Sequence, residues 1–408
     1  MSKFATSGGL KGLRVLDLGH ALAAPFCGQM LADHGADVIK IEAPDGDMSR
    51  RIGPYAEDDT THEYGGMFQS CNRNKRGMVI DFKNAAGREV FLQLVDRADV
   101  LIENFRAGVM ERLGLGFDAL SKRNPRLVYT SIRGFGDPRN GRTVYTDWPA
   151  VDIVAQAMGG LMSITGPDGN SPMKVGGGPG DTIPGLFAAY ATLVAIIESR
   201  VSGKGQYVDV AMVDSMVALF EPLTVTYSYT GTPARPNGSR MPAIAPFGRV
   251  ATKDGFGVLA VSAGRGWALF CELIGRAELA TDPRFATPAA RGVNEDAVYA
   301  VVEEFTSKHS CADLVTLFGG KIPFAPVYDS EDIFNDPYFQ VREMLPQVEQ
   351  PGSQRKVTVA GVPQKLSRTP GGVHQRAPTL GEHTEDILGE LGIDGGAIAA
   401  LRQSGAVA

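Results

Sequence analysis

Short apolar runs alternate with amphipathic segments along the first third of the chain. The runs are rich in β-branched and aliphatic residues, which is typical of strands buried in a parallel sheet. They cover residues 14–18 (RVLDL), 37–42 (DVIKIE), 99–104 (DVLIEN) and 126–136 (RLVYTSIRGFG). Segments with helical periodicity, about 26–34 and 85–97, separate them. This alternation predicts an α/β fold with a parallel, doubly wound sheet.

The second half of the chain changes character at residue 221. Helical patterns over 151–162 and 183–200 are followed by a stretch, 221–246, in which seven of 26 residues are Pro or Gly. The 408 residues also exceed the roughly 250–300 that one core usually supports. We therefore interpret 221–246 as a linker into a second domain. That domain is predicted to include a strand at 255–263 and helices at 267–274 and 294–308.

A glycine-rich turn, Gly176 to Gly180, delivers Asp181 to the start of an apolar helix. Aspartate is a preferred N-cap residue, and the positive end of the helix dipole favours its ionised form. An ionised carboxylate beside glycines, which let another molecule approach the backbone, is also suited to nucleophilic catalysis. The residues alone leave both interpretations open, an ordinary helix cap and a nucleophile.

Composition narrows the classes of partner. The formal net charge of −6 disfavours nucleic acid as a main partner, and the longest apolar run is too short for a membrane span. The four cysteines have no metal-ligand spacing and form no disulfide framework, and the N-terminus lacks a signal-peptide core. The loop after the first strand lacks the G-x-G-x-x-G dinucleotide fingerprint. We expect a cytoplasmic protein that binds no metal.

Taken together, several motifs resemble the class III coenzyme A transferases, the family of formyl-CoA transferase and carnitine CoA-transferase. The resemblance covers nearly the whole chain and keeps the motifs in the family's order. It rests on residues 12–47, 74–83 (NKRGMVIDFK), 98–116, 124–136, 203–215 (GKGQYVDVAMVDS), 244–250 (IAPFGRV) and 380–388 (LGEHTEDIL).

The resemblance implies a particular architecture. A Rossmann-like large domain would use both ends of the chain, residues 1–220 and 335–408, and 247–334 would form a smaller α+β domain. Two ring-like subunits would interlock as a homodimer.

The resemblance also implies a function and its residues. The protein would move CoA from an acyl-CoA thioester to a carboxylic acid through a thioester on Asp181, with CoA as a substrate and no cofactor required. The binding residues implied for CoA are His20, Ala21, Leu22 and Ala23 at the thiol end, and Lys83, Asn104, Phe105, Arg106 and Arg112 at the nucleotide end. Gly177 and Gly178 would help to bind the reacting carbonyl, and Asp152 would support Asp181 or the helix start. Ala43 and Leu22 replace an arginine and a glutamine of formyl-CoA transferase, so contacts there should differ.

Alternatives remain at this point. An α-methylacyl-CoA racemase of the same superfamily would need a histidine where Val151 stands, and an idle CoA-binding protein would more often have lost Asp181. The acid acceptor stays open as well. Pairing of Arg240 with a second carboxylate would favour a dicarboxylic acid such as succinate or mesaconate, whereas an exposed linker arginine is the ordinary interpretation.

Overall fold

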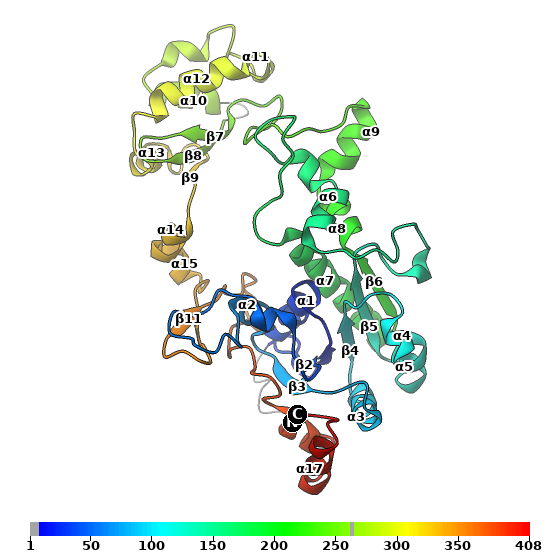
Figure 1. Cartoon of the computed structure of the whole chain (residues 1–408). Coiled ribbons are helices and arrows are strands. Elements are labelled where there is room, and N and C mark those ends of the chain that lie inside the picture. Colours follow the sequence, from blue (N-terminus) through cyan, green and yellow to red (C-terminus); the bar gives the residue numbers. More distant parts are fainter. Residues whose placement is uncertain (1–7, 262–264) are drawn as a thin grey trace. The chain divides into compact units, whose positions relative to one another are not determined.

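The computed structural model describes residues 8–261 and 265–408 (Figure 1). The chain folds into two compact units. The first holds the described residues up to Leu161 together with Val175–Ser228 and Pro337–Ala408. The second holds Met162–Lys174 and Tyr229–Asp336. The second unit is therefore inserted into the first.

A six-stranded parallel sheet in the order β3-β2-β1-β4-β5-β6 forms the centre of the first unit (Figure 1). Its strands are β1 (Arg14–Asp17), β2 (Asp37–Glu42), β3 (Arg76–Val79), β4 (Val100–Glu103), β5 (Val128–Arg133) and β6 (Tyr207–Ala211). The α/β class is predicted correctly, and the four apolar runs correspond to β1, β2, β4 and β5. This strand order is that of doubly wound dinucleotide-binding folds, in which the order reverses between β1 and β4.

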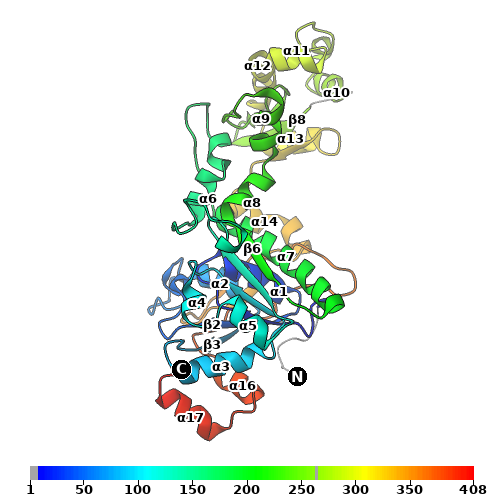
Figure 2. The same cartoon turned by 90° about the vertical axis from the view of Figure 1, so that its right-hand side faces the viewer.

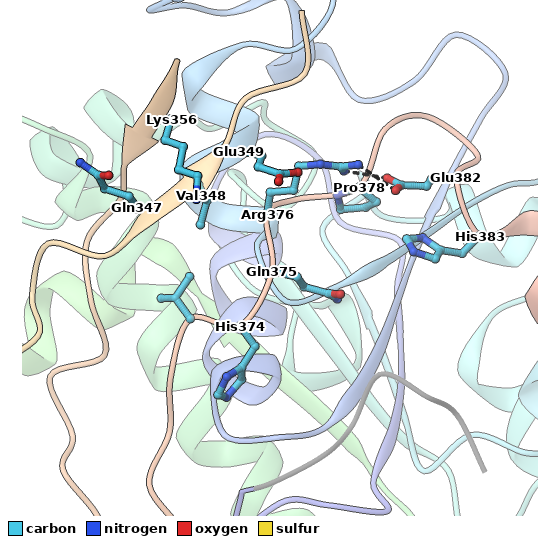
Figure 3. A pocket seen from close by; sticks show the side chains of 11 residues that line it. Gln347, Val348, Glu349, Lys356, His374, Gln375, Arg376, Pro378, Glu382 and His383 are labelled. Atoms are coloured by element: carbon cyan, nitrogen blue, oxygen red, sulfur yellow. Dashed lines mark hydrogen bonds and ion pairs between the residues drawn. The ribbon is translucent and has the colours of Figure 1, made fainter. Parts of the chain in front are cut away.

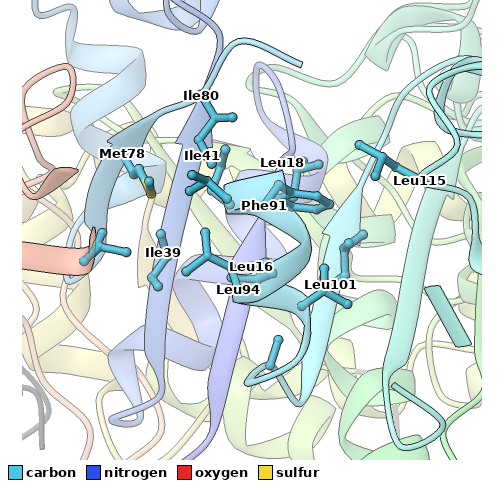
Figure 4. Close-up of a cluster of buried hydrophobic side chains, with 14 of the residues drawn as sticks. Leu16, Leu18, Ile39, Ile41, Met78, Ile80, Phe91, Leu94, Leu101 and Leu115 are labelled. Atoms are coloured by element: carbon cyan, nitrogen blue, oxygen red, sulfur yellow. The ribbon is translucent and has the colours of Figure 1, made fainter. Parts of the chain in front are cut away.

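Alternate residues of each strand face opposite helical layers, as the period of a strand requires. On one face, Leu16, Ile39 and Leu101 pack with Phe91 and Leu94 of α3 (Ala85–Val95) in the main hydrophobic core (Figure 4). The opposite face is covered by α1 (Ala23–Asp33) and α7 (Pro179–Ser202). There Thr130 of β5 and Thr192 of α7 form a buried hydrogen bond of 2.7 Å between their hydroxyls.

The remaining elements of the first unit are shorter. They are helices α2 (Gly66–Asn72), α4 (Val109–Arg112), α5 (Phe117–Arg123), α6 (Asp152–Met158), α8 (Met212–Leu219), α15 (Pro337–Val341), α16 (Thr384–Glu390) and α17 (Gly395–Gln403), with the hairpin of β10 (Gln347–Glu349) and β11 (Lys356–Thr358). Figure 2 shows α16 and α17 at the same end of the unit as α3. The C-terminal segment completes the sheet region, since Ile80 pairs with Val407 and Ile387 enters the main core.

Helices α1 and α7 approach each other closely because small residues face the contact. A Cβ on Gly185 would lie 2.6 Å from the carbonyl oxygen of Ala23 and 3.1 Å from the ring of Phe26. The first turns of the two helices are therefore held side by side, and this contact decides where Asp181 lies.

The second unit has a three-stranded antiparallel sheet, β7 (Phe247–Ala251), β8 (Phe256–Ala260) and β9 (Phe324–Pro326). One face packs on a core that includes Trp267, Phe270 and Phe285. Its helices are α9 (Tyr227–Thr230, shared with the first unit), α10 (Gly266–Leu273), α11 (Pro288–Val293), α12 (Glu295–Thr306), α13 (Cys311–Phe318) and α14 (Ser330–Asn335). The predicted strand at 255–263 corresponds to β8, and residues 262–264 lie outside the described residues.

Some predicted boundaries are wrong in detail. Residues 162–174 group with the second unit, because Gly238 N–H donates to Gly166 O and ties that segment to the stretch before β7. Part of the predicted linker is helical, over Pro222–Thr226 and Tyr227–Thr230. Helix α1 begins three residues before the predicted Phe26, because Pro25 is tolerated in a first turn, where its missing N–H is not needed.

We predict that Gly185→Ala destabilises the protein, because its Cβ has no room against Ala23 O. Overpacking of this kind typically costs about 1–3 kcal/mol. The exposed helical Gly389 is the matched control, because no atom lies within 4 Å of its added Cβ. Gly389→Ala should gain roughly 0.5–1 kcal/mol from helix propensity. Chemical denaturation measures both, and equal effects at the two glycines would contradict the packing argument.

Candidate active site

The candidate site lies where the strand order reverses. In open α/β sheets, ligands bind at this point beyond the carboxyl ends of the strands. Here the β1–α1 loop (18–22) meets the end of β4, and Asn104 connects them. His20 N–H donates to Asn104 Oδ1 at 2.8 Å, and Asn104 Nδ2 donates back to His20 O at 2.9 Å.

A pocket of about 450 Å³ opens at this point, within the first unit. That volume is in the usual range for small-ligand sites. The structure brings eight of the nine predicted CoA-binding residues and the predicted nucleophile to this pocket. They are His20, Ala21, Leu22, Ala23, Asn104, Phe105, Arg106, Arg112 and Asp181.

Asp181 stands in the first turn of α7 and is not its N-cap, so the predicted cap is wrong. Gly178 is the N-cap, and Pro179 occupies the first helical position, where its fixed φ suits the helix. The backbone N–H groups of Asp181 and Thr182 both donate to Gly178 O. Within the described chain, no group donates a hydrogen bond to the half-buried Asp181 carboxylate. Its oxygens are therefore free to react.

The pKa of Asp181 differs from what its place at a helix N-terminus alone would give. Burial, and then the negative charge of Asp152, raise its pKa to about 6. These two effects outweigh the attraction of the helix N-terminus, which alone would lower the pKa. Asp181 is thus mostly ionised at neutral pH but more basic than an ordinary aspartate.

Asp152 supports the start of α7. Its Oδ1 accepts a hydrogen bond from Gly180 N–H at 2.8 Å, and Gln156 Nε2 donates to both carboxylate oxygens, at 3.0 and 2.9 Å. Gln156 Oε1 in turn accepts from Val175 N–H. This network fixes the glycine turn from α6, so the side chain that raises the pKa of Asp181 also positions its helix.

Polar and charged groups line the rest of the pocket. The guanidinium-bearing residues Arg106 and Arg112 are exposed, as ligands for phosphate groups must be. Burial, and then the charge of Lys40, lower the pKa of His20, whose ring lies 5.2 Å from that of Phe105. His20 is therefore a neutral imidazole at neutral pH.

Four predicted residues lie elsewhere or border the pocket. Lys83 is exposed beyond the end of β3, outside the pocket lining. Gly178 touches the pocket through Leu22, whose Cδ2 lies 2.9 Å from an added Cβ, and Gly177 has a positive φ of 73°. Arg240 belongs to the second unit, where it pairs with Asp296 at 2.8 Å and stacks over Tyr299.

Sequence reasoning missed two parts of the lining. Arg133, at the end of β5, is buried and paired with Glu103 at 3.3 Å and with Asp137. The segment 146–150 brings Trp148, which is 56% exposed, next to Val151, the position already named for the racemase histidine. The strand-end position of Arg133 was a usable signal, because functional groups gather there. The loop residue Trp148 belongs to no sequence pattern that would have indicated a site residue.

Another pocket of about 380 Å³ lies against the β10–β11 hairpin and the C-terminal segment (Figure 3). Three of its polar side chains are already engaged, since Arg376 pairs with Glu382 at 2.7 Å and His383 Nδ1 accepts from Gly77 N–H. It contains none of the predicted site residues. The described residues also include no group of three or more His, Cys, Asp or Glu side chains that could hold a metal ion.

Comparison with known proteins identifies the family. The model for CoA-transferase family III matches residues 10–384. A succinyl-CoA:mesaconate CoA-transferase of Haloarcula marismortui is 43% identical over 392 residues, covering 95% of this chain and 98% of its own. A succinate–glutarate CoA-transferase of Agrobacterium fabrum is 36% identical over 388 residues, covering 94% of this chain and 95% of its own.

A solved structure is similar as well. The crystal structure of a CAIB/BAIF family protein from Brucella suis is 35% identical, with a TM-score of 0.84, and covers 95% of this chain and 100% of its own. The chain therefore belongs to CoA-transferase family III and transfers CoA between acyl-CoA thioesters and acids. The resemblance predicted from the motifs is confirmed.

The raised pKa gives a pH prediction. Because Asp181 has a pKa of about 6, the kcat/KM for an acyl-CoA should rise with pH and reach half of its plateau near pH 6. Asp152→Asn removes one of the two causes while keeping an oxygen for Gly180 N–H. The apparent pKa should then fall below 6 but stay above that of an exposed aspartate, since burial is the larger cause.

The control for this pH profile is Asp118→Asn, which changes an acid in the first turn of α5 that pairs with Arg139. This change should leave the profile in place. A profile that is flat from pH 5 to 8, or one that both variants shift equally, would contradict the assignment to Asp181.

Proposed function

We propose that this enzyme moves CoA between small, dicarboxylic acids through a thioester on Asp181. One observation carries the proposal: the Asp181 carboxylate, to which no group of the described residues donates a hydrogen bond, lies in the same pocket as the β1–α1 loop, Arg106 and Arg112. A structural aspartate would usually be paired or would cap a helix. An unpaired one facing a substrate-sized pocket is suited to attack.

The pocket offers partners for both ends of CoA. Arg106 and Arg112 would bind the phosphates of the nucleotide, with Asn104 and Phe105 beside them. Residues His20 to Ala23 would line the pantetheine and its thiol, next to Asp181. Lys83 is exposed outside this pocket, so we assign it no more than an outer contact with the nucleotide.

The chemistry then runs in four balanced steps. A carboxylate oxygen of Asp181 attacks the donor thioester carbonyl, giving a mixed anhydride and CoA thiolate. The thiolate attacks the aspartyl carbonyl, which forms the aspartyl-CoA thioester and releases the donor acid. The acceptor carboxylate attacks that thioester and expels the thiolate. The thiolate takes the acyl group from the second anhydride, which restores Asp181.

Each step develops negative charge on a carbonyl oxygen, and hydrogen-bond donors must meet it. In the described chain, no protein acceptor is found for the backbone N–H groups of Gly177 and Gly178. Gly177 and Gly178 follow two and three residues after Val175, whose backbone N–H donates a hydrogen bond to Gln156 Oε1. We assign them to the developing oxyanion, with Asp152 keeping their turn in place.

The acid substrates are proposed from the relatives. Enzymes named for succinyl-CoA with mesaconate and for succinate with glutarate share 43% and 36% identity with this chain. Succinate, mesaconate and glutarate all carry two carboxylates. Arg240 does not support this choice, because Asp296 and Glu295 already engage its guanidinium.

We also propose that the enzyme acts as a homodimer, with the interlocked subunits that the family resemblance implies. Support comes from α7, on which apolar side chains at helical spacing form an exposed stripe of Leu186, Tyr190, Val194, Ile197 and Val201. Tyr190 is 67% and Val201 87% exposed. Exposed apolar stripes of this kind mark protein contacts, and a second copy of the chain is the partner we propose.

A membrane is the other surface that could cover an apolar helix. Contrary to the sequence expectation, α7 is long and apolar enough to cross one, alone among the described residues, although 44% of its most apolar stretch is buried. Its buried side packs on α1 and the sheet, so spanning would expose that core. We therefore propose a cytoplasmic location, with which the four free cysteines agree.

The transfer itself is tested by Asp181→Ala. With succinyl-CoA as donor and mesaconate or glutarate as acceptor, we expect the rate of CoA transfer to fall more than about 1,000-fold, because the nucleophile is lost. CoA binding, measured by calorimetry, should change by less than about threefold, since the phosphate contacts remain. Transfer at near the wild-type rate would refute the mechanism.

Two controls accompany this experiment. Glu198→Ala removes an exposed carboxylate from the same helix and should leave transfer unchanged. Incubation with acyl-CoA in deuterated water and no acceptor should label no α-carbon. Labelling would indicate the racemase alternative, whose histidine is replaced by Val151 in this pocket.

The dimer is tested on the exposed stripe of α7. Replacing Tyr190 and Ile197 by Glu places two charges on this face, so the mass measured by analytical ultracentrifugation should halve. Val293→Glu is the control, because Val293 in α11 is 86% exposed but belongs to the second unit. An unchanged dimer in the double variant, or a wild-type monomer, would contradict the proposal.

A further inference from the structure

Side chains bond several backbone polar groups of the β1–α1 loop. Gly19 N–H donates to Asp17 Oδ1 at 2.8 Å, and Asn104 holds both polar groups of His20. The Gly19 carbonyl and the Ala21 N–H are both bonded to one buried ion pair, Lys40 with Asp47. Neither member of this pair lines the pocket.

Lys40 and Asp47 are fully buried, with no exposure of either side chain. Lys40 Nζ donates to Asp47 Oδ2 at 2.9 Å and to Gly19 O. Asp47 Oδ1 accepts from Ala21 N–H at 3.1 Å and from the N–H and hydroxyl of Ser49, at 2.9 and 2.8 Å. One oxygen of the Asp47 carboxylate therefore binds the Lys40 ammonium group, and the other binds the backbone of the β1–α1 loop.

Ala21 needs this support because its backbone has a φ of 61°. The left-handed region costs a non-glycine residue of order 1–3 kcal/mol, so such a conformation persists only where neighbouring groups impose it. The hydrogen bonds at Gly19, His20 and Ala21 do so here. This conformation of Ala21 lets the chain pass directly from the end of β1 into the first turn of α1.

We propose that Lys40 and Asp47 are positioning residues for CoA transfer, holding Gly19 and Ala21 so that the β1–α1 loop fits the thioester beside Asp181. This inference rests on the proposed function, in which residues 20–23 line the thiol end of CoA. It assigns a catalytic consequence to two residues that touch neither substrate nor nucleophile.

The charges of the pair are stable over the working pH range. Burial opposes ionisation of both groups, but their mutual attraction and hydrogen bonds outweigh it. The pKa of Lys40 is raised and that of Asp47 is lowered well below its usual range. The pair therefore acts as a fixed support and adds no titration to the pH profile.

The route from the pair to the nucleophile is short. Leu22 follows Ala21 and touches Gly178, the N-cap of α7, while Ala23 O lies against Gly185 in the next turn. A shift of the loop would move the wall of the pocket relative to Asp181. Misplacement by about 1 Å can slow a positioned reaction about 100-fold.

The test compares double variants that leave no unpaired charge in the core. Lys40→Met/Asp47→Ala, the deletion variant, removes the ion pair and the acceptor for Ala21 N–H. Lys40→Met/Asp47→Asn, the rescue variant, removes the same charges but keeps an oxygen for that N–H. The control, Arg73→Met/Asp33→Ala, deletes another buried pair of the first unit, joined at 2.7 Å, that bonds no residue of the loop.

We expect the deletion variant to lose about 10- to 100-fold in kcat for transfer from succinyl-CoA, because the loop is no longer held. The rescue variant should recover most of this loss, and the control should keep the wild-type kcat. Melting temperatures should fall in all three variants. Dissociation constants for CoA should change much less than kcat, since Arg106 and Arg112 are untouched.

Two results would overturn the inference. The first is a wild-type kcat in the folded deletion variant, which would reduce the pair to a purely structural role. The second is an equal loss in the control or no recovery in the rescue variant, since the effect would then follow stability. A wild-type enzyme that transfers no CoA would instead refute the proposed function, so the two failures are distinguishable.

Asp47→Glu covers the case in which the deletion variant does not fold. It keeps the charge opposite Lys40 but moves the carboxylate oxygens by one methylene. We expect a folded protein with a kcat reduced about tenfold or more, because Ala21 N–H loses its acceptor at the original position. A kcat equal to that of the wild type would overturn the inference.

Discussion

The site depends on the close contact between the first turns of α1 and α7. Gly185 allows the backbone of α7 to lie against Ala23 O, and no larger residue fits there. Asp181, one turn before Gly185, is brought in this way to the β1–α1 loop. The parallel sheet supplies the other half of the arrangement, because it places the ends of β1 and β4 side by side at the reversal of strand order.

The acidic residues around this contact are of two kinds, which differ in whether they have a charged partner. The supporting acids are paired and buried, as in Lys40 with Asp47 and Lys75 with Asp17. Asp181 is half-buried, and within the described chain it has neither a cation nor a hydrogen-bond donor. A paired acid holds its shape but is a poor nucleophile, whereas an unpaired one keeps its lone pairs available. Burial also raises the pKa of Asp181, so more of this carboxyl is protonated, and therefore unreactive, at acid pH than in an exposed aspartate.

Much of the fold could be predicted from the sequence. Strands β1, β2, β4 and β5 are buried on both faces and read as continuous apolar runs, so a local pattern identifies them. The turn before Asp181 could also be recognised from a local pattern, because Gly176, Gly177 and Gly178 are consecutive. The motifs then placed His20, Asn104 and Arg106 in one site, and the structure brings them to one pocket.

The predictions that were wrong or missing concern residues whose surroundings are set by contacts between distant parts of the sequence. Burial of Asp181, and then the charge of Asp152, 29 positions away in the sequence, raise its pKa. The N-cap falls on Gly178 because Pro179 occupies the first helical position. Arg240, a candidate for binding a substrate carboxylate, pairs instead with Asp296, 56 positions on. Trp148 lines the pocket through the path of its loop, which no local pattern encodes, whereas Arg133 was overlooked although it stands at the end of β5. Lys40 and Asp47 resembled an ordinary strand lysine and an ordinary loop aspartate.

The central claim is that Asp181 carries CoA covalently during transfer. The most direct measurement is mass spectrometry of peptides from enzyme incubated with succinyl-CoA alone and quenched in acid. The account predicts that the peptide containing Asp181 gains the mass of CoA less one water, and that hydroxylamine converts this adduct to a hydroxamate. An unmodified Asp181 in enzyme that transfers CoA, or an adduct on another carboxylate, would contradict it.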